Sequence, residues 1–225
     1  GWKILDPKVF IKMRLNNEKI FGRNLLITFD DGFKSNKILI RKLNKKFGIK
    51  CILFIPYSFL TMIKSEDLKK FCEDKLGVKK ADYSNINLDI NDLKILLDNG
   101  NIVGSHTINH PNLSKIKDDN ELKNEIILSR ELLERKLSCK VNIFSITFGN
   151  IESINQKTMD ICKNNYDIIF SGIRGENFNN NSPIIFRDEL NPSYSYKMCK
   201  SIINGNIDIF YKSSRKKILD YLSQL

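Results

Sequence analysis

Residues 25–36 read LLITFDDGFKSN, and they direct the fold prediction because a strand-like apolar run leads straight into a turn and a helix. The turn carries two adjacent carboxylates, Asp30 and Asp31, followed by a glycine. Adjacent like charges at the end of a buried strand repel each other and lose hydration, so such a pair needs a compensating partner or lies in solvent. An Asp pair before Gly is also a common turn sequence, and the motif alone leaves both interpretations open.

Strand-like and helix-like segments alternate along the rest of the chain. Apolar runs predict strands at residues 24–29, 50–56, 101–106, 141–149, 166–172 and 184–190. Amphipathic patterns predict helices at 35–48, 65–76, 90–100, 118–138, 153–165, 194–203 and 213–223, the first with Ser35 as N-cap and Gly48 as its end. This alternation is typical of a parallel sheet or barrel, and we expect one α/β domain over 1–225 with an insertion at 58–90.

Chemistry in such folds collects at the carboxyl ends of the strands. Asp30 and Asp31 follow one predicted strand, and His106 follows another. The chain has only two histidines, and both fall within GSHTINHPN as His106 and His110. A carboxylate plus two imidazoles is a common ligand set for catalytic Zn²⁺. A bound dication would hold one carboxylate as a ligand and leave its neighbour free for another task.

The composition of the chain argues against several other classes of protein. The net charge of +11 comes from lysines spread along the whole chain, which argues against a nucleic-acid partner. The five cysteines form no CxxC pair and predict free thiols in a reducing compartment. No run is long enough to span a bilayer and no signal peptide is visible, so we expect a cytoplasmic location. Because the chain begins at Gly1 rather than Met, removal of an N-terminal segment and an exported form stay open as the alternative. Trp2 is expected to pack rather than to serve as a sugar platform.

Two motifs together carry a resemblance to a known family. ITFDDGF at 27–33, followed by GSHTINHPNLSKI at 104–116, resembles the polysaccharide deacetylases, the NodB-homology enzymes of the carbohydrate esterase family 4 type. Their first motif is TFDDG, and their second is H-[ST]-x-x-x-H or its form one residue shorter, which His106, Thr107 and His110 match.

Two later segments match the same family more loosely. FSITFGN at 144–150 resembles a third motif, F-x-Y-P-[YF]-G, with Thr147 where proline is usual. IIFRDEL at 184–190 resembles an extended family segment that carries an arginine, here Arg187. The resemblance covers about residues 24–210.

The resemblance implies a distorted (β/α)7-type barrel and metal-dependent hydrolysis of an N-acetyl, or less often O-acetyl, group on a sugar. It implies Zn²⁺ as the metal, with Co²⁺ or Ni²⁺ as alternatives. The matching residues are Asp30 as catalytic base, Arg187 to orient and ionise it, the metal ligands Asp31, His106 and His110, the N–H of Phe148 as an oxyanion donor, and Thr107, Phe148 and Gly149 on the substrate side.

The implied substrate is an acetylated sugar in a surface polysaccharide, or in a lipid-linked or nucleotide-sugar precursor met at a membrane surface. Alternatives are an amidase on a non-sugar amide with the same barrel and a catalytically impaired carbohydrate-binding relative. The family also places a histidine near the C-terminus as general acid, and this chain has none to match it. Water on the metal, Asp30 after protonation, or a loop lysine or tyrosine are the candidates for that role.

Overall fold

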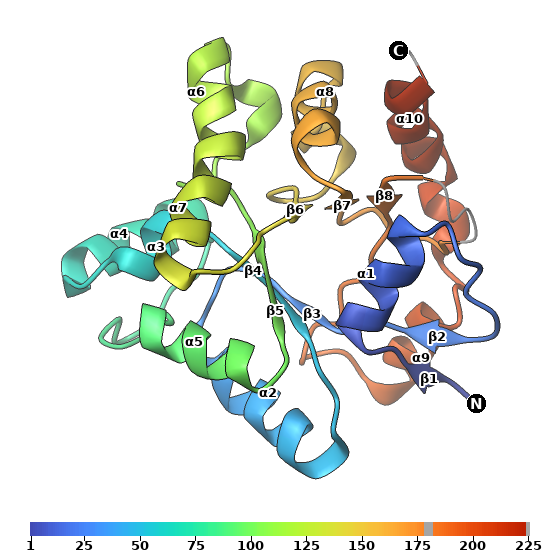
Figure 1. Ribbon diagram of the computed structural model, residues 1–225, viewed down its shortest axis with the longest axis horizontal. Coiled ribbons are helices and arrows are strands. Elements are labelled where there is room, and N and C mark those ends of the chain that lie inside the picture. The colour runs from blue at the N-terminus through green and yellow to red at the C-terminus, as the bar shows by residue number, and fades with distance from the viewer. Residues whose placement is uncertain (178–181, 224–225) are drawn as a thin grey trace.

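A curled parallel sheet forms the centre of the molecule, in a computed structural model that describes residues 1–177 and 182–223 (Figure 1). Its six strands lie in sequence order: β3 (Thr28–Phe29), β4 (Ile52–Ile55), β5 (Ile102–Ser105), β6 (Ile143–Ser145), β7 (Ile168–Phe170) and β8 (Ile184–Ile185). Every neighbouring pair is parallel, as strand–helix–strand units require. This half-barrel in a single α/β domain confirms the predicted fold class.

Helices surround the sheet (Figure 1). Those before β6 are α1 (Pro7–Leu15), α2 (Lys34–Phe47), α3 (Tyr57–Thr61), α4 (Ser65–Lys75), α5 (Ile90–Asp98), α6 (Asp119–Lys123) and α7 (Ser129–Leu137). Those after it are α8 (Gln156–Asn165), α9 (Tyr196–Ile203) and α10 (Lys212–Ser223), and short helical turns are η1 (Leu113–Lys115), η2 (Asn124–Leu128), η3 (Ile151–Ser153) and η4 (Asp208–Tyr211). None of the helices in the described chain has the length and apolarity needed to cross a bilayer.

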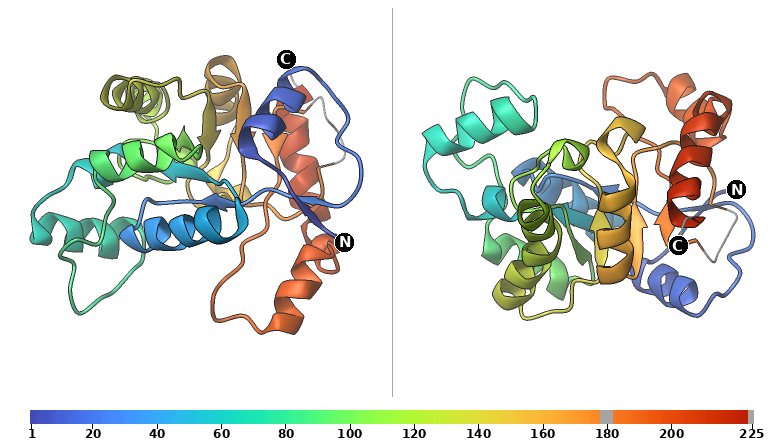
Figure 2. Two further views of the ribbon diagram at one scale, coloured as in Figure 1. Left: turned by 60° about the horizontal axis from the view of Figure 1, so that its bottom comes forward. Right: turned by 90° about the horizontal axis from the view of Figure 1, so that it is seen from above.

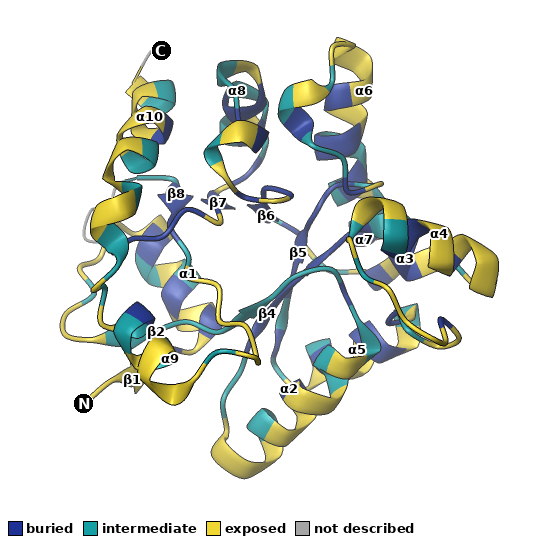
Figure 3. Cartoon of the chain, turned by 180° about the vertical axis from the view of Figure 1, so that it is seen from behind, coloured by how far each residue is buried: buried dark blue, intermediate teal, exposed yellow. Residues whose placement is uncertain are grey.

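The strands bury both of their faces, as a sheet covered on two sides must. In β4, Ile52 and Phe54 pack in one apolar cluster, and the alternate residues Leu53 and Ile55 pack in another. Buried residues accordingly concentrate on the strands and the inward sides of the helices, while the outer sides are exposed (Figure 3).

The first helix, α1, was not expected from the sequence. Asp6 caps it by accepting from the N–H groups of Lys8 and Val9 at 2.8 and 3.3 Å. Its Phe10 packs on Phe170 with ring centroids 6.4 Å apart, and Phe170 lies 4.9 Å from the ring of Phe54. Helix α1 therefore adds Phe10 to a cluster of aromatic rings, with Phe170 and Phe54, inside the curled sheet.

Local boundaries differ from the sequence predictions most clearly in three segments. The strand expected at 24–29 is interrupted, so that β2 (Asn24–Leu25) pairs with β1 (Lys3–Ile4) and only β3 joins the main sheet. Helix α2 begins at Lys34, so its N-cap is Phe33, two residues before the predicted Ser35, while Gly48 ends it at φ +67° as predicted. The helix expected at 118–138 contains a π-helical turn, η2.

Candidate active site

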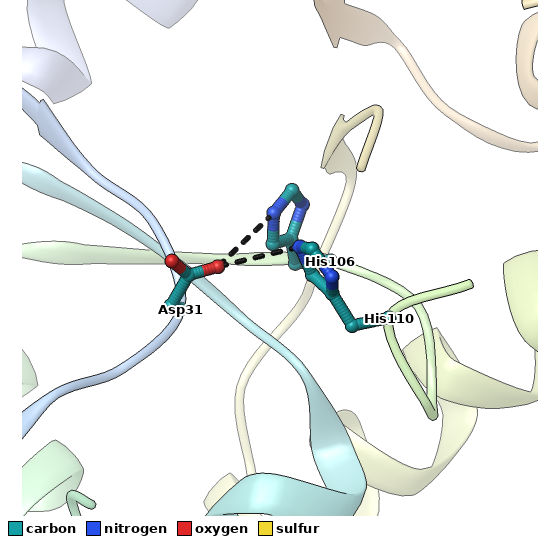
Figure 4. Close-up of side chains that lie close together, drawn as sticks. All are labelled: Asp31, His106 and His110. Carbon is teal, nitrogen blue, oxygen red and sulfur yellow. Dashed lines mark ion pairs between the residues drawn. The ribbon is translucent and has the colours of Figure 1, made fainter. Parts of the chain in front are cut away.

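The three predicted metal ligands converge at one end of the sheet. Asp31 follows β3, and His106 and His110 follow β5, two strands away. The Asp31 Oδ1 atom lies 3.6 Å from His106 Nε2 and 3.4 Å from His110 Nε2, with all three side chains pointing toward one another (Figure 4). Their potential ligand atoms lie within 4.8 Å of one another. The structure thus brings the three residues together, and their role as metal ligands stays a prediction.

Both imidazole rings are held in the tautomer that a metal requires. His106 Nδ1 lies 2.7 Å from the carbonyl oxygen of Ser145, and His110 Nδ1 lies 3.1 Å from that of Lys75. A carbonyl only accepts, so each ring carries its proton on Nδ1 and presents the Nε2 lone pair toward Asp31. Two such imidazoles and a carboxylate fit a divalent transition metal, and Zn²⁺ in particular.

The charge states of the cluster also suit a cation. Burial, with the nearby charge of Asp30, raises the pKa of Asp31 to about 6, although His106 opposes the shift. Burial, with the neighbouring His106, lowers the pKa of His110 to about 3. At neutral pH the metal-free site therefore offers an anionic carboxylate and a neutral His110, which are the forms that bind metal.

Asp30 faces a different partner from Asp31. Arg187, which follows β8, donates from Nη1 to Asp30 Oδ1 and from Nη2 to Oδ2, each at 2.8 Å. Burial alone raises the pKa of Asp30, but the charge of Arg187, with help from His106, outweighs it and holds the pKa at about 2. Asp30 is thus ionised at any physiological pH, and its Oδ2 lies 4.0 Å from His106 Nε2.

Arg187 itself is fixed by three further hydrogen bonds and by contacts with two aromatic rings. Its Nη1 donates to Thr28 Oγ1 at 3.1 Å, its Nη2 to Ser145 Oγ at 2.7 Å, and its Nε to the Ser171 carbonyl at 2.9 Å. The guanidinium also lies over the rings of Phe54 and Phe170, at 5.2 and 5.8 Å from their centroids. Sequence reasoning missed Ser145, which holds both His106 and Arg187 and carries no motif signature.

Strained backbone concentrates in this region. Non-glycine residues with positive φ include Asp31 (70°), Thr107 (70°), His110 (52°) and Phe148 (61°), all of them predicted site residues. Such conformations cost energy and persist only where surrounding contacts enforce them. The Thr107 side chain is fully buried, and its Oγ1 accepts the His110 N–H at 2.9 Å. Thr107 thus holds the backbone of His110 within the loop, and its contact with substrate stays a prediction.

Glu125 fixes the same histidine loop from the outside. Its Oε2 accepts the N–H groups of Ile108 and Asn109 at 2.8 and 2.9 Å, and its Oε1 accepts from Asn109 Nδ2 at 2.7 Å. The carboxylate belongs to η2 and is only 5% exposed. One sequence signal could have revealed it, because Glu125 lies on the apolar stripe of its helix beside Leu122 and Ile126.

Phe148 and Gly149 form the last part of the site. The Phe148 ring is 53% exposed and meets the His110 ring edge-on at 4.9 Å. Among the described residues, no acceptor pairs with the backbone N–H of Phe148. Gly149 has φ +64°, and a Cβ there would stand 2.3 Å from the Gly172 nitrogen, so the two glycine backbones pack directly and fix the Phe148 loop.

The region expected to be an insertion, 58–90, also contributes to this site. Its helix α4 ends at Lys75, whose carbonyl orients His110. The sequence carried no signal for this contact, since a backbone carbonyl can belong to any residue.

Comparison with known proteins gives one family. The model of the family described as polysaccharide deacetylase matches residues 20–165, well over half of the chain. A peptidoglycan-N-acetylglucosamine deacetylase of Bacillus cereus is 42% identical over 76 residues, which make up 34% of this chain and 25% of the relative. The match to this curated relative thus spans a quarter of the relative's length.

Solved structures of low sequence identity share the fold. The Streptococcus pyogenes deacetylase PplD has a TM-score of 0.68 at 20% identity, with 90% of this chain and 80% of that chain covered. A de-N-acetylase from Aggregatibacter actinomycetemcomitans has a TM-score of 0.68 at 14% identity, with coverages of 90% and 83%. IcaB from Ammonifex degensii has a TM-score of 0.66 at 16% identity, with coverages of 90% and 82%.

Replacing Glu125 by Ala is expected to weaken zinc binding by about tenfold or more and to lower the free energy of unfolding by about 2–4 kcal/mol, because two backbone N–H groups lose their acceptor. Glu125→Gln keeps a carbonyl acceptor and should lose much less. Zinc titration and urea unfolding measure both effects. Glu131→Gln, on an exposed position of α7, is the matched control, and equal behaviour of the Ala variant and this control would contradict the role of Glu125.

Zinc affinity should fall as the pH drops through about 6, because a proton on Asp31 then competes with the cation. One pH unit below that pKa, the affinity should be about tenfold lower from this group alone. Calorimetric or dye-competition titration across this range measures the effect. In Asp31→Asn the affinity should be low throughout and this step should disappear, so an unchanged pH profile in that variant would refute the assignment.

Proposed function

The chain belongs to the polysaccharide deacetylase family, and we propose that it is a metal-dependent hydrolase that removes an N-acetyl group from a sugar unit of a glycan. One observation carries the proposal: an ionised Asp30, clamped by Arg187, lies beside a separate cluster of Asp31, His106 and His110. A binding module has no need of two carboxylates with such different partners, whereas amide hydrolysis uses both.

Asp31, His106 and His110 would hold the metal through Oδ1 and the two Nε2 atoms. A divalent ion bound there supplies Lewis acidity, which polarises a carbonyl and lowers the pKa of water to about 7. Because Asp31, His106 and His110 supply the proposed ligand atoms, Asp30 is left for proton transfer. Zn²⁺ is our choice of metal, with Co²⁺ or Ni²⁺ compatible with the same nitrogen and oxygen donors.

Asp30 would act as the base that takes a proton from the attacking water. A pKa of about 2 keeps its carboxylate ionised, but it also makes the carboxylate a weak base. It therefore accepts a proton only from water whose acidity has been raised. Arg187 donates to both carboxylate oxygens, and Oδ2 also accepts a long hydrogen bond from Ser145 Oγ at 3.4 Å, so Oδ1 is the oxygen that keeps a second lone pair for the proton.

The same low pKa bears on the missing general acid. Both histidines belong to the proposed ligand set, so neither is free to protonate the amine that leaves. A carboxyl group with a pKa near 2 gives up its proton readily to an amine, which is far more basic. We therefore assign both proton transfers to Asp30, first as base and then as acid.

Negative charge would develop on the acetyl oxygen as water adds to the carbonyl. The Phe148 N–H has no acceptor among the described residues, which makes it available for a hydrogen bond to that oxygen. The Gly149–Gly172 packing fixes the position of this donor in advance. The exposed Phe148 ring lies beside it, where it can contact the sugar.

The sugar is proposed to be an N-acetylated hexosamine within a surface glycan or its lipid-linked or nucleotide-linked precursor. The family name and the peptidoglycan-N-acetylglucosamine deacetylase of Bacillus cereus support this class of substrate. An oligomer of N-acetylglucosamine is accordingly the first substrate to test.

Asp30→Asn is expected to lower acetate release from an N-acetylglucosamine oligomer by about 10²–10⁴-fold, because the amide can neither accept nor return the proton. Its zinc content after purification should equal that of the unmodified protein. Acetate assay and elemental analysis measure the two properties. Asp98→Asn, at the exposed end of α5, is the control, and full activity in Asp30→Asn would overturn the assignment.

A further inference from the structure

A second cavity lies apart from the proposed active site. It has a volume of about 370 Å³ and is lined by Trp2, Arg23, Glu176, Asn204 and Asn206. Trp2 directly precedes β1, and Asn204 directly follows α9, two elements that lie side by side in Figures 1 and 2. The cavity shares no residue with the Asp30, Asp31 and histidine cluster.

The polar side chains of this cavity are exposed and make few contacts with the part of the chain that the structure describes. Within residues 1–177 and 182–223, the side chains of Glu176, Asn204 and Asn206 make no hydrogen bond or ion pair. Arg23 makes one contact there, with its guanidinium 5.8 Å from the centroid of the Trp2 ring. An amide pair, a carboxylate, a guanidinium and an indole N–H therefore keep their hydrogen-bonding capacity for a ligand.

A neighbouring cavity extends the first. It has a volume of about 240 Å³ and is lined by Gly205, Asp208, Arg215 and again Glu176. The Asp208 Oδ1 atom in its wall is buried and lacks a hydrogen-bond partner among the described residues. Buried acceptors in native proteins are normally paired. The Asp208 carboxylate in the wall of this cavity therefore has unused acceptor capacity.

The charge and shape of the lining indicate the class of ligand. One cation, Arg23, balances one anion, Glu176, in a chain whose overall charge is +11. A phosphate or an acidic polymer would be attracted more strongly to lysine-rich parts of the chain than to this neutral lining. Planar amides and a carboxylate form hydrogen bonds with the adjacent hydroxyls of a sugar, and the indole offers an apolar surface to the C–H groups of a sugar ring.

We propose that this pair of cavities binds a neutral oligosaccharide, as a glycan-holding site remote from the site of deacetylation. The choice of a sugar rests in part on the proposed function. Trp2 is 40% exposed, so in addition to the packing expected from the sequence it contributes to the cavity wall. Such a site would retain a long glycan on the protein while its acetylated units reach Asp30 in turn.

The chain offers a direct probe, because Trp2 is its only tryptophan. A soluble N-acetylglucosamine oligomer titrated into the intact protein should change the Trp2 emission saturably. Asn206→Ala should weaken this binding by about tenfold through the loss of a hydrogen bond. Asn120→Ala, exposed on α6, is the matched control and should bind as the unmodified protein does. A thermal unfolding scan of both variants verifies that each is folded.

Several results would overturn the proposal. They are an emission that does not respond to the oligomer, a response of equal affinity in folded Asn206→Ala, or a response to inorganic phosphate in place of the sugar. The titration is repeated in Asp30→Asn, which should keep the response without releasing acetate. A saturable response in the unmodified protein that releases no acetate from the oligomer would support the glycan-holding site and contradict the proposed function, whereas acetate release without a response would do the reverse, so the two failures are distinguishable.

Discussion

The bidentate ion pair between Arg187 and Asp30 is the interaction on which the rest of the site depends. Asp30 follows β3 and Arg187 follows β8, which are the two edge strands of the six-stranded sheet. The pair therefore bridges the open edges of the half-barrel, helped by the bond from Arg187 to Thr28. Both side chains are largely shielded, with 14% and 30% exposed. Removing one partner of such a pair leaves an uncompensated charge, which typically costs about 3–5 kcal/mol when buried.

This clamp explains how two neighbouring aspartates acquire different chemistry. The guanidinium holds the pKa of Asp30 at about 2, whereas burial beside that fixed charge raises the pKa of Asp31 to about 6. Environments that separate the pKa values of paired carboxylates are how enzymes assign distinct roles to them. The positive φ of Asp31 turns its side chain away from Arg187 and toward the histidines. The adjacent pair in TFDDG is thus divided by backbone geometry as much as by charge.

Sequence patterns predicted the parts of the fold that follow local rules. The alternating strands and helices were predicted because apolar periodicity reports burial directly, and the proposed ligands His106 and His110 stood out because they are the only two histidines of the chain. Helix α1 was not predicted because it buries only Pro7, Phe10 and Arg14, too few residues for a clear apolar periodicity. Ser145 and the Lys75 carbonyl were not predicted because their roles arise from contacts between residues distant in sequence, which no local pattern encodes. Glu125 carried a local signal in its place on an apolar helix stripe, but that signal does not identify its partners in the histidine loop. The break between β2 and β3 likewise reflects pairing with β1, a tertiary event.

The central claim is that Asp31 holds a metal while Asp30 remains bound to Arg187. Anomalous diffraction at the zinc edge from crystals of the zinc-loaded protein tests it most directly. The account predicts one peak within coordination distance of Asp31 Oδ1, His106 Nε2 and His110 Nε2, with both hydrogen bonds from Arg187 to Asp30 intact. A zinc ion coordinated by Asp30 with Arg187 displaced, or an empty cluster at saturating zinc, would contradict it.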